Sequence, residues 1–255
     1  MAEYQWTVRR RDTMLVGHIK EIVRHPVKSF RGESVQKTNV MQYGVYGDRS
    51  HAFLDETRPG KFLTITQHQK MVQYQARFVG EESMIAYPTV EITSPEGKVM
   101  AWGDEDLLRA MENESKRKVS FIEYSPTHVP LGAIEAEPIQ LVTDASLNEL
   151  QTIWGKDHLD HRRFRPNFVI SLTHKIPFIE QTWFGKRMKI GRDVEIELRR
   201  PCERCMIITV SPDDAKRDPT LQKAVQKNCA NHFGVYASVT RTGEIGVGDE
   251  VFLLY

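Results

Sequence analysis

Short apolar runs separated by turn residues dominate this chain, and they predict strands more often than helices. In the first half they predict strands at residues 15–27, 51–55, 61–65, 90–93 and 99–102. In the second half they predict strands at residues 168–172, 187–190, 194–198, 205–210, 235–240 and 247–254. Turn residues predict four hairpins, which pair 51–55 with 61–65, 90–93 with 99–102, 187–190 with 194–198, and 235–240 with 247–254.

Helical spacing of apolar residues occurs in only three places. Residues 104–111 begin with acidic side chains and continue with leucines and a methionine. Ser146 and Glu149 have the spacing of a capping box and predict a helix over residues 146–154, and residues 221–226 predict a third helix. We therefore expect a mainly β protein with a few helices, an α+β chain built from barrel-like sheets rather than a doubly wound sheet.

A stretch with three prolines, residues 126–138, separates the two halves and predicts a domain boundary there. We expect one domain at residues 14–125 and a second at residues 126–255. The first would be the smaller, barrel-like unit.

Composition and charge narrow the function classes. The 255 residues include 35 basic and 34 acidic side chains, a net charge of +1, which argues against a general nucleic-acid binder but permits a local cationic pocket. No run of eighteen apolar residues and no apolar leader occur, so we expect neither a membrane partner nor a signal peptide. Three cysteines fit a reducing compartment better than a disulfide framework, and we expect a cytoplasmic location.

The pair Cys202 and Cys205 is the strongest chemical signal. Arg204 precedes Cys205, and a thiolate beside a fixed positive charge is both a nucleophile and a ligand for soft metals. Zinc is disfavoured because the sequence offers only one further cysteine, Cys229, where four ligands are needed. A thioredoxin-like redox pair is disfavoured because Cys205 leads into a β-rich run, whereas two structural thiols remain an open alternative.

Cationic residues near strand ends form a second signal. Lys28 and Ser29 follow the first predicted strand, Arg49 leads into the strand at 51–55, and Arg165 precedes the strand at 168–172 together with Asn167. Ammonium and guanidinium groups at such ends suit an anionic ligand. The alternatives are a solvated strand end for Lys28 and Ser29, a pair with the neighbouring aspartate for Arg49, and a surface basic cluster for Arg165.

Five motifs in this order resemble the MOSC (molybdenum cofactor sulfurase C-terminal) domain family. They are His25-Pro26-Val27-Lys28-Ser29, Gly47-Asp48-Arg49, Phe164-Arg165-Pro166-Asn167, Cys202-Glu203-Arg204-Cys205 and Gly246-Val247-Gly248-Asp249-Glu250-Val251. The chain is most similar to members that carry a preceding MOSC N-terminal β-barrel domain, as in the amidoxime-reducing component.

The resemblance implies a MOSC β-barrel domain that binds the molybdenum cofactor in its molybdopterin form. Cys205 matches the cysteine that coordinates molybdenum. The residues that match the positions holding the pterin and its phosphate are Lys28, Ser29, Arg49, Arg165 and Asn167, with Glu203 and Arg204 flanking the ligand cysteine. Glu203 departs from the family pattern, which has a small or neutral residue there, and its carboxylate would repel an anionic metal centre. Glu135 stands near a position where the family has an aspartate.

The activity implied by the resemblance is reduction of N-hydroxylated or other N-oxygenated small molecules, with electrons from a separate donor protein. Two alternatives remain open on the sequence. The chain would be a sulfur carrier or cofactor-handling protein with a persulfide on Cys205, or a zinc- or thiol-dependent binding module.

Overall fold

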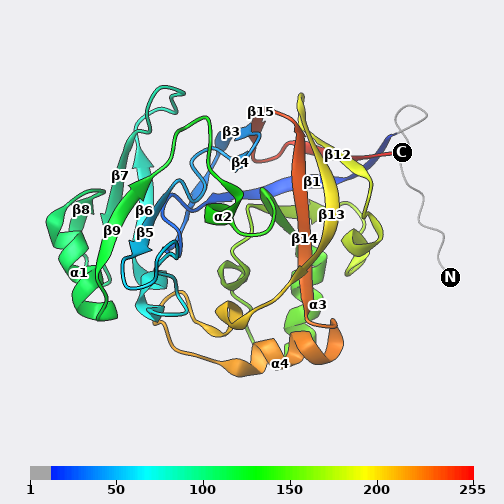
Figure 1. Cartoon of the computed structure of the whole chain (residues 1–255). Coiled ribbons are helices and arrows are strands. Elements are labelled where there is room, and N and C mark those ends of the chain that lie inside the picture. Colours follow the sequence, from blue (N-terminus) through cyan, green and yellow to red (C-terminus); the bar gives the residue numbers. More distant parts are fainter. Residues whose placement is uncertain (1–12) are drawn as a thin grey trace.

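The computed structural model describes residues 13–255, and Figure 1 shows its arrangement. The polar segment 1–12, in which we expect no signal peptide, lies outside the described residues. The strands are β1 (Thr13–Arg24), β2 (Glu33–Val35), β3 (Lys37–Met41), β4 (Gly44–Val45), β5 (His51–Asp55), β6 (Gln75–Val79), β7 (Thr89–Thr93), β8 (Val99–Ala101), β9 (Val119–Glu123), β10 (Ile139–Thr143), β11 (Phe168–Leu172), β12 (Arg187–Ile190), β13 (Val194–Glu203), β14 (His232–Arg241), β15 (Gly243–Gly246) and β16 (Glu250–Leu254). The α-helices are α1 (Glu105–Ser115), α2 (Leu131–Ile134), α3 (Asp144–Trp154) and α4 (Pro219–Asn228). The 3₁₀ helices are η1 (Gln69–Gln73), η2 (His161–Phe164), η3 (Ile179–Thr182) and η4 (Met206–Thr209).

A closed barrel of seven strands forms the larger part of the molecule. Its order is β11, β10, β14, β13, β12, β16 and β1, and β1 closes the ring by pairing with β11. Apolar side chains of these strands, among them Val16, Ile170 and Ile196, fill the interior. Because the ring is closed, none of its strands has a free edge. Helices α3 and α4 lie together at one end of the barrel in Figure 1.

The remaining strands form smaller sheets beside the barrel. The sheet β6-β7-β8, the pair β5-β9 and helix α1 lie together in Figure 1. They share an apolar core that contains Phe53, Met71 and Ile92, and α1 contributes Leu107 and Met111. The spacing of Leu107 and Met111 places both on one face of the helix, which is the face that packs on the sheet.

Most predicted elements are confirmed, as is the mainly β class with few helices. Strands β5, β11 and β12 have the predicted bounds, and the hairpins β7-β8 and β12-β13 form with antiparallel pairing. Helices occur where the patterns at 104–111 and 221–226 predict them, as α1 and α4. Within the described residues, no helix is both long and apolar enough to cross a bilayer.

The prediction of a strand at 205–210 is wrong. Strand β13 ends at Glu203, and the β-branched run forms the 3₁₀ helix η4, in which the Thr209 hydroxyl donates to the Met206 carbonyl oxygen at 2.7 Å. Ile208 is buried in a cluster with α4, so tertiary packing outweighs the β propensity of the sequence.

The predicted terminal hairpin is also wrong. Strand β14 pairs with β10 and β13, whereas β16 pairs with β1 and β12. The intervening β15 pairs with β3 from the first half of the chain, so the residues next to the expected turn do not connect a hairpin. Likewise, residues 61–65 contribute only an isolated bridge between Leu54 and Phe62 instead of a hairpin strand.

Several element boundaries differ from the predictions. The first strand ends at Arg24, before the His25-Pro26 step, rather than at residue 27. Helix α3 begins at Asp144, and Thr143 caps it by accepting a hydrogen bond from the Ser146 backbone N–H. The Ser146 hydroxyl instead donates to the buried Glu180 at 2.9 Å, so it is not the cap.

The division into domains at 14–125 and 126–255 stays a prediction. Two pairings link these ranges closely: β1 completes the barrel of the later strands, and β15 adds to the sheet of β3 and β4.

Candidate functional site

Four chain segments meet at a cleft of about 550 Å³. They are the turn after β1, the turn before β5, the segment that joins η2 to β11, and the segment that joins β13 to η4. All predicted site residues except Asn167 line this cleft: Lys28, Ser29, Arg49, Arg165, Glu203, Arg204 and Cys205. The other lining residues are Ile65, Glu135, Gln140, Phe164, Ile207 and Tyr236. The fold thus brings together side chains that are more than 170 positions apart in sequence.

Backbone hydrogen bonds hold the first two segments side by side. The Lys28 N–H donates to the His51 carbonyl oxygen at 2.8 Å, and the Arg49 N–H donates to the His25 carbonyl oxygen at 2.6 Å. Val27 and His51 form a parallel bridge between these contacts. The two turns therefore present Lys28 and Arg49 to the same space.

Three of the lining residues have left-handed backbone conformations although none is glycine. The φ angles are 74° at Ser29, 54° at Arg49 and 54° at Arg165. Residues with a Cβ adopt this region only when the surrounding structure imposes it, and such positions cluster at functional sites.

The two cysteines of the Cys-x-x-Cys pair have opposite environments. Cys202 is fully buried, and its sulfur accepts a hydrogen bond from Nη1 of Arg204 at 2.8 Å. Cys205 follows β13, directly precedes η4 and is exposed at the cleft. Cys205 is therefore the thiol that a ligand in the cleft can reach.

Arg165 and Arg204 are only partly satisfied by the protein. Each donates one hydrogen bond of 2.8 Å to a backbone carbonyl oxygen, that of Phe30 for Arg165 and that of Phe164 for Arg204. Nη2 of Arg165 and Nε of Arg204 are buried without a hydrogen-bond partner, and neither side chain forms an ion pair with any residue in the range 13–255. Burial lowers the pKa of Arg165 to about 9, with Arg49 acting in the same direction, so the group stays charged at neutral pH.

Lys28 and Arg49 each have one carboxylate partner. Nζ of Lys28 donates to Glu135 at 2.6 Å and to the Ala133 carbonyl oxygen at 2.8 Å. Burial lowers the pKa of Lys28, and the nearby Glu135 carboxylate opposes that shift. Arg49 pairs with the buried Asp48; although burial alone would raise the pKa of this carboxyl, Arg49 holds it well below the usual value.

Asn167 does not line the cleft. Its Oδ1 accepts from the Gln140 N–H at 3.0 Å, and its Nδ2 donates to the Val23 carbonyl oxygen at 3.3 Å. It thereby ties β10 to β1 next to the segment that carries Arg165. The structure gives Asn167 a positioning role, and its predicted contact with the pterin stays a prediction.

Sequence reasoning missed two polar residues of the cleft wall, Gln140 and Tyr236. Gln140 is a polar residue in the otherwise buried strand β10, and its Nε2 donates to the Phe164 carbonyl oxygen at 3.0 Å. Tyr236 comes from β14, and burial together with Cys202 raises the pKa of its hydroxyl. A polar side chain inside a buried strand is the signal that could have identified Gln140.

This donor set fits an anionic group that is attached through sulfur. It offers one reachable thiol, two guanidinium groups with unused buried N–H donors, and further cations from Lys28 and Arg49. No three His, Cys, Asp or Glu side chains within residues 13–255 converge to hold a metal ion. A metal at Cys205 would therefore need most of its ligands from a cofactor.

Known proteins are similar to this chain over nearly its whole length. Residues 125–252 match the MOSC domain, and residues 16–125 match the MOSC N-terminal beta barrel domain. The chain is 26% identical over 297 residues to the mitochondrial amidoxime-reducing component 1 of Danio rerio, which covers 98% of this chain and 88% of that protein. It is 26% identical over 300 residues to the mitochondrial amidoxime reducing component 2 of Rattus norvegicus, with 96% and 85% covered.

The fold is similar to the crystal structure of the YUAD protein from Bacillus subtilis. The TM-score is 0.52 at 15% identity, and the match covers 98% of this chain and 100% of that one. At this identity the likeness concerns the fold alone.

Proposed function

This chain belongs to the MOSC domain family, in the form with a MOSC N-terminal beta barrel domain, and we propose that it is a molybdenum-cofactor-dependent reductase of N-oxygenated small molecules. The proposed substrates are N-hydroxylated compounds such as amidoximes, since the relatives that align over nearly the whole chain are named amidoxime-reducing components. We further propose that a separate protein donates the electrons and that the enzyme works in the cytoplasm.

One observation of the cleft carries the proposal. The exposed Cys205 thiol shares a cleft with Arg165 and Arg204, each of which has a buried N–H donor without a protein partner. Buried donors normally find partners, and an unsatisfied one costs about 1–3 kcal/mol. An anionic cofactor would supply the missing acceptors, and a cofactor metal would take the thiolate as a soft ligand.

Reduction of an N-hydroxy group consumes two electrons and two protons, cleaves the N–O bond and releases water. The cofactor, when bound, supplies the two-electron redox chemistry. The chain would hold the cofactor's anionic groups with Lys28, Arg49 and Arg165 and fix the metal at Cys205. The buried Cys202 would orient Arg204 through its hydrogen bond of 2.8 Å.

The exposure of Cys205 also favours a second candidate function, transfer of sulfur as a cysteine persulfide. A persulfide carrier needs a reachable thiol beside positive charge, and Cys205 next to Arg204 provides both. The two functions differ in their measurable products, because a carrier would hold one additional sulfur atom and would not turn over an amidoxime.

The test uses protein purified from a host that synthesises the cofactor. We expect molybdenum near one atom per chain by mass spectrometry, and turnover of benzamidoxime with reduced methyl viologen as artificial donor. Cys205→Ala should lose the metal and the activity, whereas Cys229→Ala is the matched control because this half-buried thiol does not line the cleft.

Metal retained at full occupancy in Cys205→Ala would contradict the ligand assignment. A mass increase of one sulfur atom on Cys205, without molybdenum and without turnover, would contradict the reductase function and support the sulfur-carrier function.

A further inference from the structure

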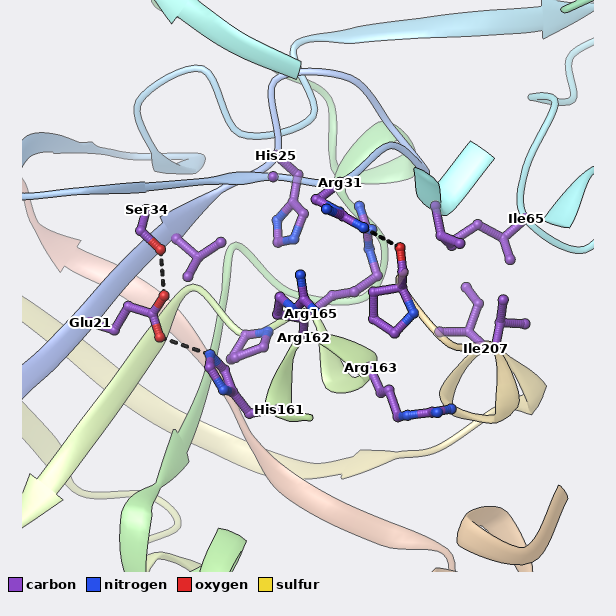
Figure 2. Close-up of a pocket in the computed structure, with 16 residues that line it drawn as sticks. Glu21, His25, Arg31, Ser34, Ile65, His161, Arg162, Arg163, Arg165 and Ile207 are labelled. Atoms are coloured by element: carbon purple, nitrogen blue, oxygen red, sulfur yellow. Dashed lines mark hydrogen bonds and ion pairs between the residues drawn. The ribbon is translucent and has the colours of Figure 1, made fainter. Parts of the chain in front are cut away.

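A second cavity lies next to the cleft, and of its wall residues only Arg165 has a role in the proposed function. It measures about 580 Å³ and shares three wall residues with the cleft, namely Ile65, Arg165 and Ile207. Figure 2 shows His25, Arg31 and Ser34 on one side and His161, Arg162 and Arg163 facing them on the other.

The cavity wall is rich in cations whose charges the protein only partly balances. Four arginines line it; Arg31 and Arg162 share the exposed carboxylate of Asp213, and Arg162 also pairs with Asp160 at 2.7 Å. Arg163 donates only to the backbone oxygens of Ile208 and Thr209, at 3.3 and 3.2 Å. The arginines of the wall therefore outnumber the carboxylates that contact them.

The one acidic side chain of the wall is already engaged. Glu21 accepts a hydrogen bond from Ser34, and one of its oxygens lies 2.7 Å from Nε2 of His161 (Figure 2). These partners lower the pKa of Glu21, with the His161 hydrogen bond as the largest cause. Glu21 therefore stays ionised, and its contacts direct it toward His161 rather than toward the arginines.

Two buried N–H donors of this wall have no acceptor within the described part of the chain. They are Nε of Arg31 and Nη2 of Arg165. A guanidinium group is suited to a carboxylate, since both are planar and the N–H groups match the two oxygens.

The rest of the wall is apolar. Val23 from β1, Val72 from η1 and Val210 after η4 contribute aliphatic surface, together with Pro166 and Pro212. Such a wall favours a ligand with a hydrocarbon body over a small inorganic ion.

We propose that this second cavity binds a small organic carboxylate, with its anionic head at Arg31 and Arg165 and its apolar body against the valines and prolines. The site goes beyond the proposed reductase function and does not require the cofactor. Because Arg165 lines both spaces, a ligand in the second cavity and an anion in the cleft would compete for the same guanidinium group. Occupancy of one site should then lower affinity at the other.

The first experiment compares benzoate with benzamide, a neutral molecule of nearly the same shape, by calorimetric titration of the full chain. The protein comes from a host that cannot synthesise molybdopterin, so the cleft holds no cofactor. We expect benzoate to bind at least about tenfold more tightly than benzamide, because a charged hydrogen-bonded pair is lost in benzamide. In the second cavity inorganic phosphate should bind more weakly than benzoate because it has no apolar body, and the part of each affinity that Arg31→Leu removes reports on this cavity.

Two variants test the location of the site. Arg31→Leu should weaken benzoate binding about tenfold or more. Arg77→Leu is the matched control, since Arg77 is an exposed arginine paired with Glu91 on the neighbouring strand. Val23→Phe keeps every charge and fills the cavity, so it should also abolish binding; circular dichroism verifies that each variant is folded.

Equal affinity for benzoate and benzamide would overturn the proposal, as would benzoate affinity that is unchanged in both Arg31→Leu and Val23→Phe. Phosphate binding without benzoate binding would also contradict it, because it would remove the role of the apolar wall. None of these outcomes depends on molybdenum, so the site and the reductase function can fail separately.

Discussion

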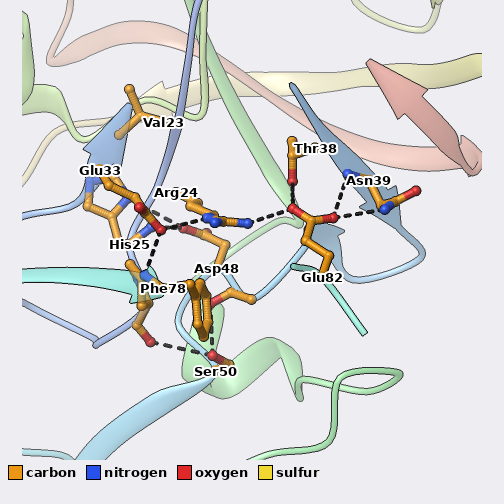
Figure 3. Close-up of polar contacts among 12 residues, drawn as sticks. Val23, Arg24, His25, Glu33, Thr38, Asn39, Asp48, Ser50, Phe78 and Glu82 are labelled. Carbon is orange, nitrogen blue, oxygen red and sulfur yellow. Dashed lines mark hydrogen bonds and ion pairs between the residues drawn. The ribbon is translucent and has the colours of Figure 1, made fainter. Parts of the chain in front are cut away.

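Arginines with buried guanidinium nitrogens lie in two regions of this molecule, and the two regions treat them in opposite ways. Arg24 is enclosed by carboxylates: its Nε lies 2.8 Å from Glu33, its Nη1 lies 2.6 Å from Glu82, and the Phe78 ring covers the guanidinium at 4.8 Å (Figure 3). Arg165 and Arg204 at the cleft have no carboxylate partner among residues 13–255, and each keeps one unused N–H.

The Arg24 group is closed by further hydrogen bonds. Glu82 also accepts from the Thr38 hydroxyl and from the backbone and side chain of Asn39, at 3.0 and 2.8 Å (Figure 3). The network fixes the loop after β6 to β3, so its role is structural. Burial of a charge therefore does not by itself mark a functional site; the hydrogen-bonding capacity that the protein leaves unused does.

The largest effect should follow from breaking the closed network. Arg24→Met keeps most of the side-chain length but leaves the largely buried Glu33 and Glu82 without a counter-charge, so it should lower the free energy of unfolding by about 3 kcal/mol in urea titrations. Arg24→Met combined with Glu33→Gln and Glu82→Gln should recover much of that loss.

The matched control is Arg77→Gln, an exposed arginine whose pair with Glu91 should contribute less than about 1 kcal/mol. A loss at Arg24 no greater than at Arg77 would contradict the structural role of the network.

The next effect concerns His25, which follows Arg24 and contacts Asp48. Burial lowers the pKa of His25 to about 3, and Arg165 adds to the shift. Between about pH 4 and 6.5 the unfolded chain binds a proton here that the folded chain does not, so stability falls as the pH falls, by up to about 1.4 kcal/mol per pH unit. His25→Asn, whose Nδ2 can replace Nδ1 toward Asp48, should flatten this dependence in urea titrations.

Parallel slopes for the wild type and His25→Asn between pH 4 and 6.5 would contradict this prediction. The lowered pKa of Asp48 affects stability mainly below its usual value of 3.8, at the acidic edge of this window, and it acts in both proteins.

A smaller stability effect is expected at Arg204, one of the two cleft arginines that keep an unused N–H donor. Arg204→Met should change the unfolding free energy of cofactor-free protein by less than about 1 kcal/mol, since no buried carboxylate loses a partner. The Phe164 carbonyl oxygen retains its hydrogen bond from Gln140. Molybdenum occupancy should nevertheless fall about tenfold, the loss of one charged hydrogen bond to the cofactor. A stability loss as large as that of Arg24→Met would make Arg204 structural instead.

The smallest effect is expected at Glu135, whose carboxylate accepts a hydrogen bond from Lys28. Glu135→Gln should release the ammonium group and raise affinity for inorganic phosphate about two- to fivefold, as expected for a partly exposed ion pair. Glu137→Gln is the control, since Glu137 pairs with Arg200 and does not line the cleft. Calorimetric titration measures both, and equal phosphate affinities would contradict this account of Glu135.

The sequence alone determined most of the local structure. Short apolar runs located β5, β11 and β12, helical spacing located α1 and α4, and five motifs in order identified the family and all but one of the residues predicted at the cleft. These features depend on neighbours within a few positions, which is the range that a pattern records.

Only the tertiary structure decided how β1 closes the barrel, that η4 is helical, and which of the two adjacent cysteines is reachable. It also decided which arginines keep unused donors, because Arg24 and Glu82 lie 58 positions apart in sequence. Partners at such separations are set by chain topology and not by local pattern. For that reason the difference between a satisfied buried charge and one that awaits a ligand is absent from the sequence motifs.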